Sequence, residues 1–146
     1  PRASSPANSP ACRAPAADAM IPRNPAAAYR STAVETRVHE ADPHALIALM
    51  LEGAIQRLRT AEACIASGDV ARKAKAAAEA GAIIDSLSGC LDLQQGGEIA
   101  ARLEALYDYA SRRVVGANAA NDPQGFAEVA ALLDDVYGAW KQIRPA

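Results

Sequence analysis

Aromatic residues and long apolar runs are both scarce in this chain of 146 residues. It holds one Phe, one Trp and four Tyr, and it has no run of about 18 apolar residues, the length that a membrane-spanning helix needs. We therefore expect no membrane insertion. Alanine, the best helix former, dominates the composition instead, and this favours a soluble helical protein.

Cysteine and histidine are too few and too scattered to predict a metal site or a disulfide framework. Cys12, Cys64 and Cys90 are widely spaced without a C-x-x-C motif, and unpaired thiols are typical of a reducing compartment, which predicts a cytoplasmic protein. His39 and His44 lack the Glu-x-x-His spacing of di-iron bundles, so we interpret both as surface residues that cap a helix or face solvent. The sequence thus predicts no cofactor and no enzymatic activity.

The charge pattern makes nucleic acid a poor candidate partner. The formal net charge is −2, and no basic stripe of the kind that contacts a phosphate backbone is present. The adjacent Arg112 and Arg113 point about 100° apart on a helix, which is typical of solvated faces or one local salt bridge.

Prolines and helix caps divide the chain into three predicted segments. Six prolines mixed with Ser, Asn and Ala predict a disordered extension over residues 1–25. Residues 26–41 form an N-terminal cap segment, for which a short helix, an extended strap and a mobile segment all remain open. Residues 42–146 form the helical domain.

Four helices are predicted in that domain, packed as an all-α, antiparallel, up-and-down four-helix bundle. Asp42-Pro43 begins the first, which ends at Ser67-Gly68, and Asp69 caps the second. Residues 92–97 form a turn whose two glycines supply positive φ, and Asp122-Pro123 begins the last helix. The residues expected to face the core recur at steps of three and four: Ile47, Met50, Leu51, Ala54, Leu58, Ala61 and Ile65; Val70, Ala74, Ala77, Gly81, Ile84, Leu87 and Leu91; Ile99, Leu103, Leu106, Ala110, Val114 and Ala117; Phe126, Val129, Leu133, Val136, Trp140 and Ile143.

Apolar residues also lie beside these stripes, which is more than four helices need to pack together. They are Leu46 and Leu49 in the first helix and Tyr107, Tyr109 and Val115 in the third. One interpretation is a wide core with exposed tyrosine hydroxyls. The other is a groove that receives the amphipathic helices of a partner.

Several short stretches, in order and at the right spacing, resemble the FliS family of flagellar secretion chaperones. They include Ala28-Tyr29, the stretch from Asp42 to Ala54, the stretch from Gly97 to Asn118, Asn121-Asp122-Pro123 and Trp140. Within the third stretch, residues 106–113 (LYDYASRR) are almost the signature of that family. The resemblance covers nearly all of residues 26–143.

The resemblance implies a chaperone without catalytic activity, which binds the disordered C-terminal region of flagellin along the outside of the bundle. Family members prevent premature polymerisation in the cytoplasm and help to deliver the client to the export gate of the flagellar type III secretion apparatus. On this basis we predict client-binding residues, with Tyr29 on a cap: Tyr29, Leu46, Leu49, Met50, Leu51, Tyr107, Asp108, Tyr109, Arg112 and Asn118.

Two other functions remain open beside the chaperone. One is a helical signalling or metal-binding bundle, and the other is a structural subunit that self-associates through its apolar face. A homodimer of the free chaperone is also left open.

Overall fold

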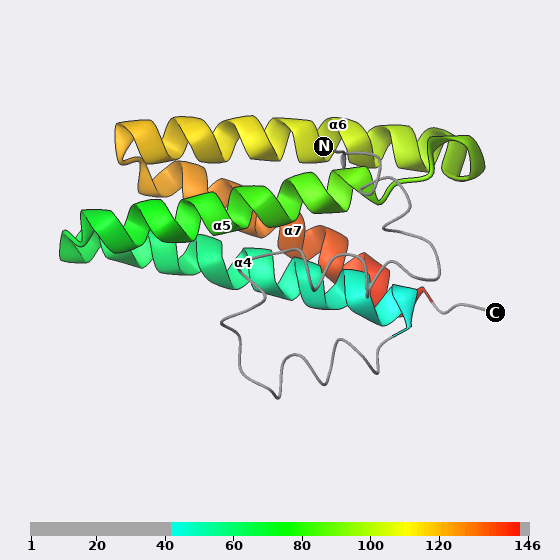
Figure 1. The fold of residues 1–146 in the computed structure, drawn as a ribbon, viewed down its shortest axis with the longest axis horizontal. Helices are drawn as coiled ribbons and strands as arrows, with labels where there is room; N and C mark the ends of the chain where they lie inside the picture. Colours follow the sequence, from blue (N-terminus) through cyan, green and yellow to red (C-terminus); the bar gives the residue numbers. More distant parts are fainter. Residues whose placement is uncertain (1–41, 144–146) are drawn as a thin grey trace, which may run out of the picture.

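A computed structural model describes residues 42–143, which form four antiparallel helices (Figure 1). They are α4 (Pro43–Ser67), α5 (Val70–Gly89), α6 (Leu93–Ala120) and α7 (Pro123–Gln142). Helix α4 packs against α5 and α7, and α6 packs less extensively against the same two helices. The predicted all-α bundle is confirmed for this part of the chain. The extension over residues 1–25 and the cap segment over residues 26–41 lie outside the described residues.

Aspartate caps begin all four helices. The Oδ1 atom of Asp42 accepts a hydrogen bond from the backbone N–H of Ala45 at 2.7 Å, and Pro43 occupies the first turn of α4. Asp69, Asp92 and Asp122 accept equivalent bonds at the starts of α5, α6 and α7. These caps satisfy N–H groups that have no partner inside the helix, so local sequence sets each boundary.

The core is built from large and small side chains that all four helices contribute. Phe126, Leu133 and Val129 of α7 are completely buried, as are Leu51 and Leu58 of α4 and Ile84 of α5. Alanines fill most of the remaining core positions, which allows the helix axes to approach closely. The predicted stripes of α4 and α7 therefore face the interior along most of their length.

The start of α6 differs from the predicted turn. Leu93, Gln94 and Gln95 form a helical turn capped by Asp92, and a kink follows at Gly97, whose φ of 55° and ψ of −130° are not helical. A positive φ strains any residue with a Cβ, so glycine is required there. The prediction was right for Gly97 and wrong for Gly96, which has no positive φ.

Three residues predicted to face the core are exposed instead. Val70 is 62% exposed, Ile99 is 73% exposed, and Ile143 is 54% exposed and follows the last residue of α7. Val70 and Ile99 lie near the starts of their helices, where neighbouring helices cover less surface. Figure 1 shows that the start of α6 extends past the end of α5. Periodicity alone does not reveal where the neighbouring helices stop.

A buried lysine links α5 to the end of α6. Lys73 is 4% exposed, and its amine donates to the backbone oxygen of Asn118 at 2.8 Å and to the side-chain oxygen of Asn121. Asn121 ends α6 with a φ of 51°. A cation at a helix C-terminus interacts favourably with the helix dipole, so the position suits Lys73.

Replacing Lys73 with methionine is expected to lower the free energy of unfolding by about 1–3 kcal/mol, because the hydrogen bonds from the buried amine to Asn118 and Asn121 are lost. Urea denaturation followed by circular dichroism measures this. Arg72→Met on the exposed side of the same helix is the control, and it should change stability by no more than about 0.5 kcal/mol. Equal effects of the two substitutions would contradict the assigned role of Lys73.

Candidate binding grooves

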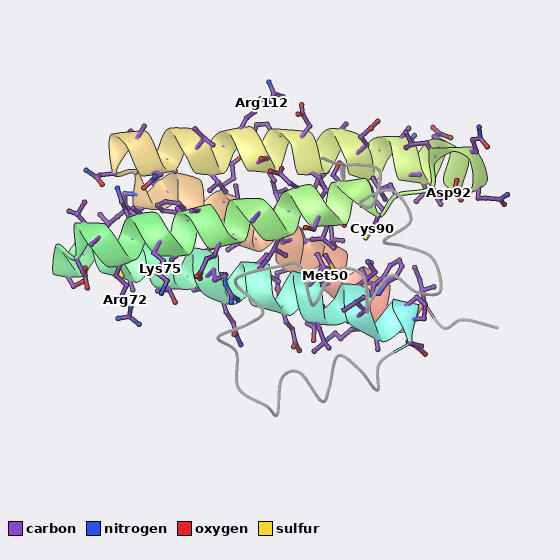
Figure 2. The ribbon with its side chains drawn as sticks, viewed as in Figure 1. Met50, Arg72, Lys75, Cys90, Asp92 and Arg112 are labelled. Atoms are coloured by element: carbon purple, nitrogen blue, oxygen red, sulfur yellow. The ribbon has the colours of Figure 1, made fainter. Side chains whose placement is uncertain are left out.

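An open groove lies at the end of the bundle where α4 and α6 begin and where α5 and α7 end. We call it the end groove; its volume is about 840 Å³. All four helices contribute apolar side chains to it: Ile47, Leu87, Leu93, Leu103, Tyr107, Val136 and Trp140. Cys90, Leu91 and Asp92, in the connection between α5 and α6, also line it. Figure 2 labels Cys90 and Asp92 at this end. The up-and-down topology thus brings residues that are far apart in the sequence, from the start of α4 to the end of α7, into one apolar surface at one end of the bundle.

A stacked pair of rings forms one side of the end groove. The His44 and Trp140 rings are 4.6 Å apart and nearly parallel. The Trp140 Nε1–H donates to the His44 backbone oxygen at 2.9 Å, and the His44 Nε2 lies 2.9 Å from the Trp140 backbone oxygen. His44 was predicted to cap a helix or to face solvent; its ring is half-buried against α7, and its hydrogen bond to the Trp140 backbone oxygen in the last turn of that helix is a capping contact.

Tyr107 lies between the end groove and a second groove. It is 3% exposed and belongs to the core, yet it lines both cavities. Burial raises the pKa of its phenol from 10.0 to about 12, with a smaller contribution from Cys90. A phenol is neutral near pH 7 even at its ordinary pKa, and the raised pKa of Tyr107 extends that neutral range, which suits an apolar wall.

The second groove, which we call the α5–α6 groove, has a volume of about 390 Å³. Asp85 and Ser88 of α5 and Glu104, Asp108 and Arg112 of α6 line it. The Ser111 hydroxyl donates to the Asp85 Oδ1 atom at 3.0 Å across the two helices. Asp108 and Arg112 form an exposed ion pair within α6 at 3.1 Å, and Figure 2 shows Arg112 pointing away from the bundle. This groove is polar, in contrast to the end groove.

The four predicted binding residues of α4 fall into two environments. Leu51 is completely buried in the core, and Met50 is partly buried and packs against it. Leu46 is 8% exposed and lies apart from the main core cluster, and Leu49 is half-buried. Of these four residues, Leu49 and Met50 are the more accessible to a partner.

Tyr109 belongs to a polar network between α6 and α7. It is 40% exposed, and its hydroxyl donates to the Glu128 Oε2 atom at 2.6 Å. Arg113 bridges Glu128 at 2.8 Å and Asp122 at 3.3 Å. The hydrogen bond from Tyr109 and then that from Arg113 lower the pKa of Glu128, and the bond to Glu128 raises the pKa of Tyr109. These hydrogen bonds and ion pairs connect α6 to α7, which have the smallest contact among the neighbouring helices of the bundle.

The predicted binding residues do not converge on one site. Asn118 lies near the opposite end of the bundle, where its backbone oxygen accepts from Lys73 and its side-chain oxygen is buried without a partner among the described residues. Tyr29 lies outside the described residues. Whether any of these residues binds a client remains a prediction.

Two residues of the end groove could not be recognised as such from sequence. Leu93 was taken as part of a turn, and Trp140 was assigned to the core stripe of the last helix. The caps at Asp42 and Asp92 could have indicated that the first and third helices begin beside the same groove, because an antiparallel bundle brings those two helix starts to the same end.

No metal site or membrane span is found in the described part of the chain. Within residues 42–143, no group of three or more His, Cys, Asp or Glu side chains is placed to hold a metal ion. None of the four helices is long and apolar enough to cross a bilayer.

Comparison with known proteins decides the family. The profile of the family described as "Flagellar protein FliS" matches residues 25–146. This chain belongs to the FliS family. The "Flagellar secretion chaperone FliS" of Salmonella typhimurium is 44% identical over 119 residues, which cover 81% of this chain and 88% of that protein.

More distant relatives carry the same name. The protein of Vibrio cholerae is 35% identical over 81% of this chain and 87% of its own length, and that of Bacillus subtilis is 35% identical over 84% and 88%. The resemblance noted from the sequence is thereby confirmed. All three of these relatives are named as flagellar secretion chaperones.

Proposed function

We propose that this chain holds the C-terminal region of flagellin in the cytoplasm, prevents its premature polymerisation and assists its delivery to the export gate of the flagellar type III secretion apparatus. Membership of the FliS family supports a secretion chaperone. The single observation that carries the binding role is the end groove, an open apolar surface of about 840 Å³ to which all four helices contribute.

The groove suits a client that is disordered when free. Such a segment orders as it binds, and burial of its apolar side chains must offset the lost conformational entropy. The end groove offers apolar side chains for this purpose, and the neighbouring α5–α6 groove offers polar ones. A client helix could thus place its apolar face in the first and its polar residues over the second.

Trp140 provides a direct test of this proposal. It is the one tryptophan of the chain, it is half-buried, and it lines the end groove. Titration with a peptide from the C-terminal region of flagellin should shift the Trp140 emission to shorter wavelengths and saturate at one peptide per chain. For this titration the peptide must itself lack tryptophan.

A scrambled peptide of the same composition is the control and should leave the emission unchanged. Absence of binding by the flagellin peptide to the full chain, measured independently by calorimetry, would overturn the proposed function. The cap role of residues 26–41 and Tyr29 belongs to the same proposal. It predicts that deletion of residues 1–41 changes the affinity for the peptide.

A further inference from the structure

The α5–α6 groove carries an excess of negative charge. The carboxylates of Asp85, Glu104 and Asp108 line it, and Arg112 is the one cationic residue among the described residues that do so. Arg112 is already paired with Asp108 at 3.1 Å, and its side chain points away from the bundle (Figure 2). The charges of the other two carboxylates are therefore left without a cation of the groove.

These two carboxylates are held in place in different ways. The Asp85 Oδ1 atom accepts a hydrogen bond from the Ser111 hydroxyl at 3.0 Å, which fixes the carboxylate against α6 without neutralising its charge. Glu104 is exposed and forms no ion pair with any residue that the structure describes. Arg102 is two positions away, about 200° around the helix, and pairs with Glu98 at 2.7 Å. Glu104 thus remains available to a cation from outside the chain.

The hydroxyl of Tyr107 is a second, independent feature of this groove. The residue is only 3% exposed, and its hydroxyl forms no hydrogen bond with the described residues. Within residues 42–143, the Oδ1 atom of Asn118 is the one side-chain polar atom that is both sealed from solvent and without a partner. The Tyr107 hydroxyl is therefore not sealed, and it opens onto the grooves that Tyr107 lines. A hydrogen bond from a ligand would satisfy it.

A cationic side chain suits both features at once. Lysine and arginine carry several N–H donors and no acceptor, so one such group can donate to a carboxylate and to the oxygen of a neutral phenol. An anionic side chain would be repelled by the carboxylates. An apolar side chain would remove water from them without replacing its hydrogen bonds.

We propose that the α5–α6 groove binds a lysine or arginine side chain of the client, while apolar residues of the same client segment occupy the end groove. This inference rests on the proposed function and adds the chemical class of a client residue. Tyr107 lines both grooves, and Leu103 of the end groove directly precedes Glu104. In a helical client, the basic residue therefore lies within about two turns, or about seven positions, of an apolar residue in the end groove.

A double-mutant cycle between the full-length protein and its client tests the pairing. One probe is the peptide from the C-terminal region of flagellin, and the other is the same peptide with every Lys and Arg replaced by Gln. Glu104→Gln is expected to weaken binding of the first peptide about fivefold and to leave the affinity for the second unchanged. Calorimetric titration measures all four affinities. Raising the ionic strength should weaken the first peptide's binding to the wild type more than its binding to the variant.

Glu98→Gln is the matched control. It makes the same chemical change on the same helix, at an exposed carboxylate that lines neither groove, and it should keep the wild-type affinity for both peptides. Arg112→Gln should act in the opposite direction, because Asp108 loses its cation. We expect it to bind the unmodified peptide about two- to threefold more tightly.

Tyr107→Phe tests the hydroxyl while it keeps the ring that packs in the core. It is expected to bind the unmodified peptide about threefold more weakly and the neutral peptide as the wild type does. Circular dichroism of each variant confirms folding. An equal loss for both peptides would show that the hydroxyl acts only on the fold, and it would remove the hydroxyl from the proposed site.

The outcomes separate this inference from the proposed function. The inference is overturned, and the proposed function stands, if the wild type binds both peptides equally or if Glu104→Gln binds the unmodified peptide as the wild type does. The same holds if the flagellin peptide that binds contains no Lys or Arg. If the wild type binds neither peptide, both are overturned.

Discussion

The double variant Leu93→Asp, Ile143→Ser is expected to bind the flagellin peptide about 30- to 150-fold more weakly than the wild type does. Both side chains line the end groove, and they are 47% and 54% exposed in the free chain. Covering their remaining apolar surface with a client contributes about 2–3 kcal/mol, which the polar replacements remove. Calorimetric titration of each protein with the peptide measures the change.

This variant should fold normally, because neither residue belongs to the core. Leu93 is the first residue of α6, where an aspartate interacts favourably with the helix dipole. Val115→Asp is the matched control, since Val115 is 68% exposed on α6 and does not line the end groove. The control should bind the peptide as the wild type does. Equal affinities of the wild type and the double variant would exclude the end groove as the client site.

Leu49→Asp distinguishes the end groove from the α4 surface predicted from sequence. Leu49 is half-buried and does not line the end groove. If the client lies only in the end groove, this substitution leaves the affinity for the peptide nearly unchanged. A large loss with Leu49→Asp and none with the groove variant would place the client on α4 instead.

Phe126→Ala is expected to lower the free energy of unfolding by about 3–5 kcal/mol. The ring is completely buried in the core, and it is the one phenylalanine of the chain. Truncation removes its buried apolar surface and leaves a cavity that the surrounding helices fill only in part. Urea denaturation monitored by circular dichroism gives the value, and a small domain can lose much of its total stability in this way.

Phe126→Leu is the matched control for this substitution. It keeps most of the apolar volume, so it should destabilise the bundle by less than Phe126→Ala does. If Phe126→Ala unfolded at the same urea concentration as the wild type, the ring would not be the packing centre that its burial indicates.

The helices could be predicted because their signals are local. Asp42-Pro43 and Asp122-Pro123 place a cap before a proline at the first helical position, and the structure begins α4 and α7 there. The start of α6 could not be predicted in the same way. The glycine pair indicated a turn, but Asp92 caps an additional helical turn before the kink at Gly97. The local sequence does not determine whether α6 begins at Asp92 or after the glycine pair, because packing against the other helices decides between these two starts.

The surfaces between helices were harder to predict. Tyr107 was expected beside a binding surface, and it proves to be a core residue that also lines two grooves. Ile99 has the spacing of a core residue, yet it is exposed near the kink. Helical periodicity assigns a residue to a face, but exposure depends on how far the neighbouring helices extend.

The contact between His44 and Trp140 has a practical consequence for labelling. It brings the beginning of α4 and the end of α7 together beside the end groove. A fluorescent reporter attached after Ile143 would therefore sit next to the proposed client and disturb the measurement. The turn at Gly68 lies at the other end of α4, about 35 Å away along its 25 residues, and is the better attachment point.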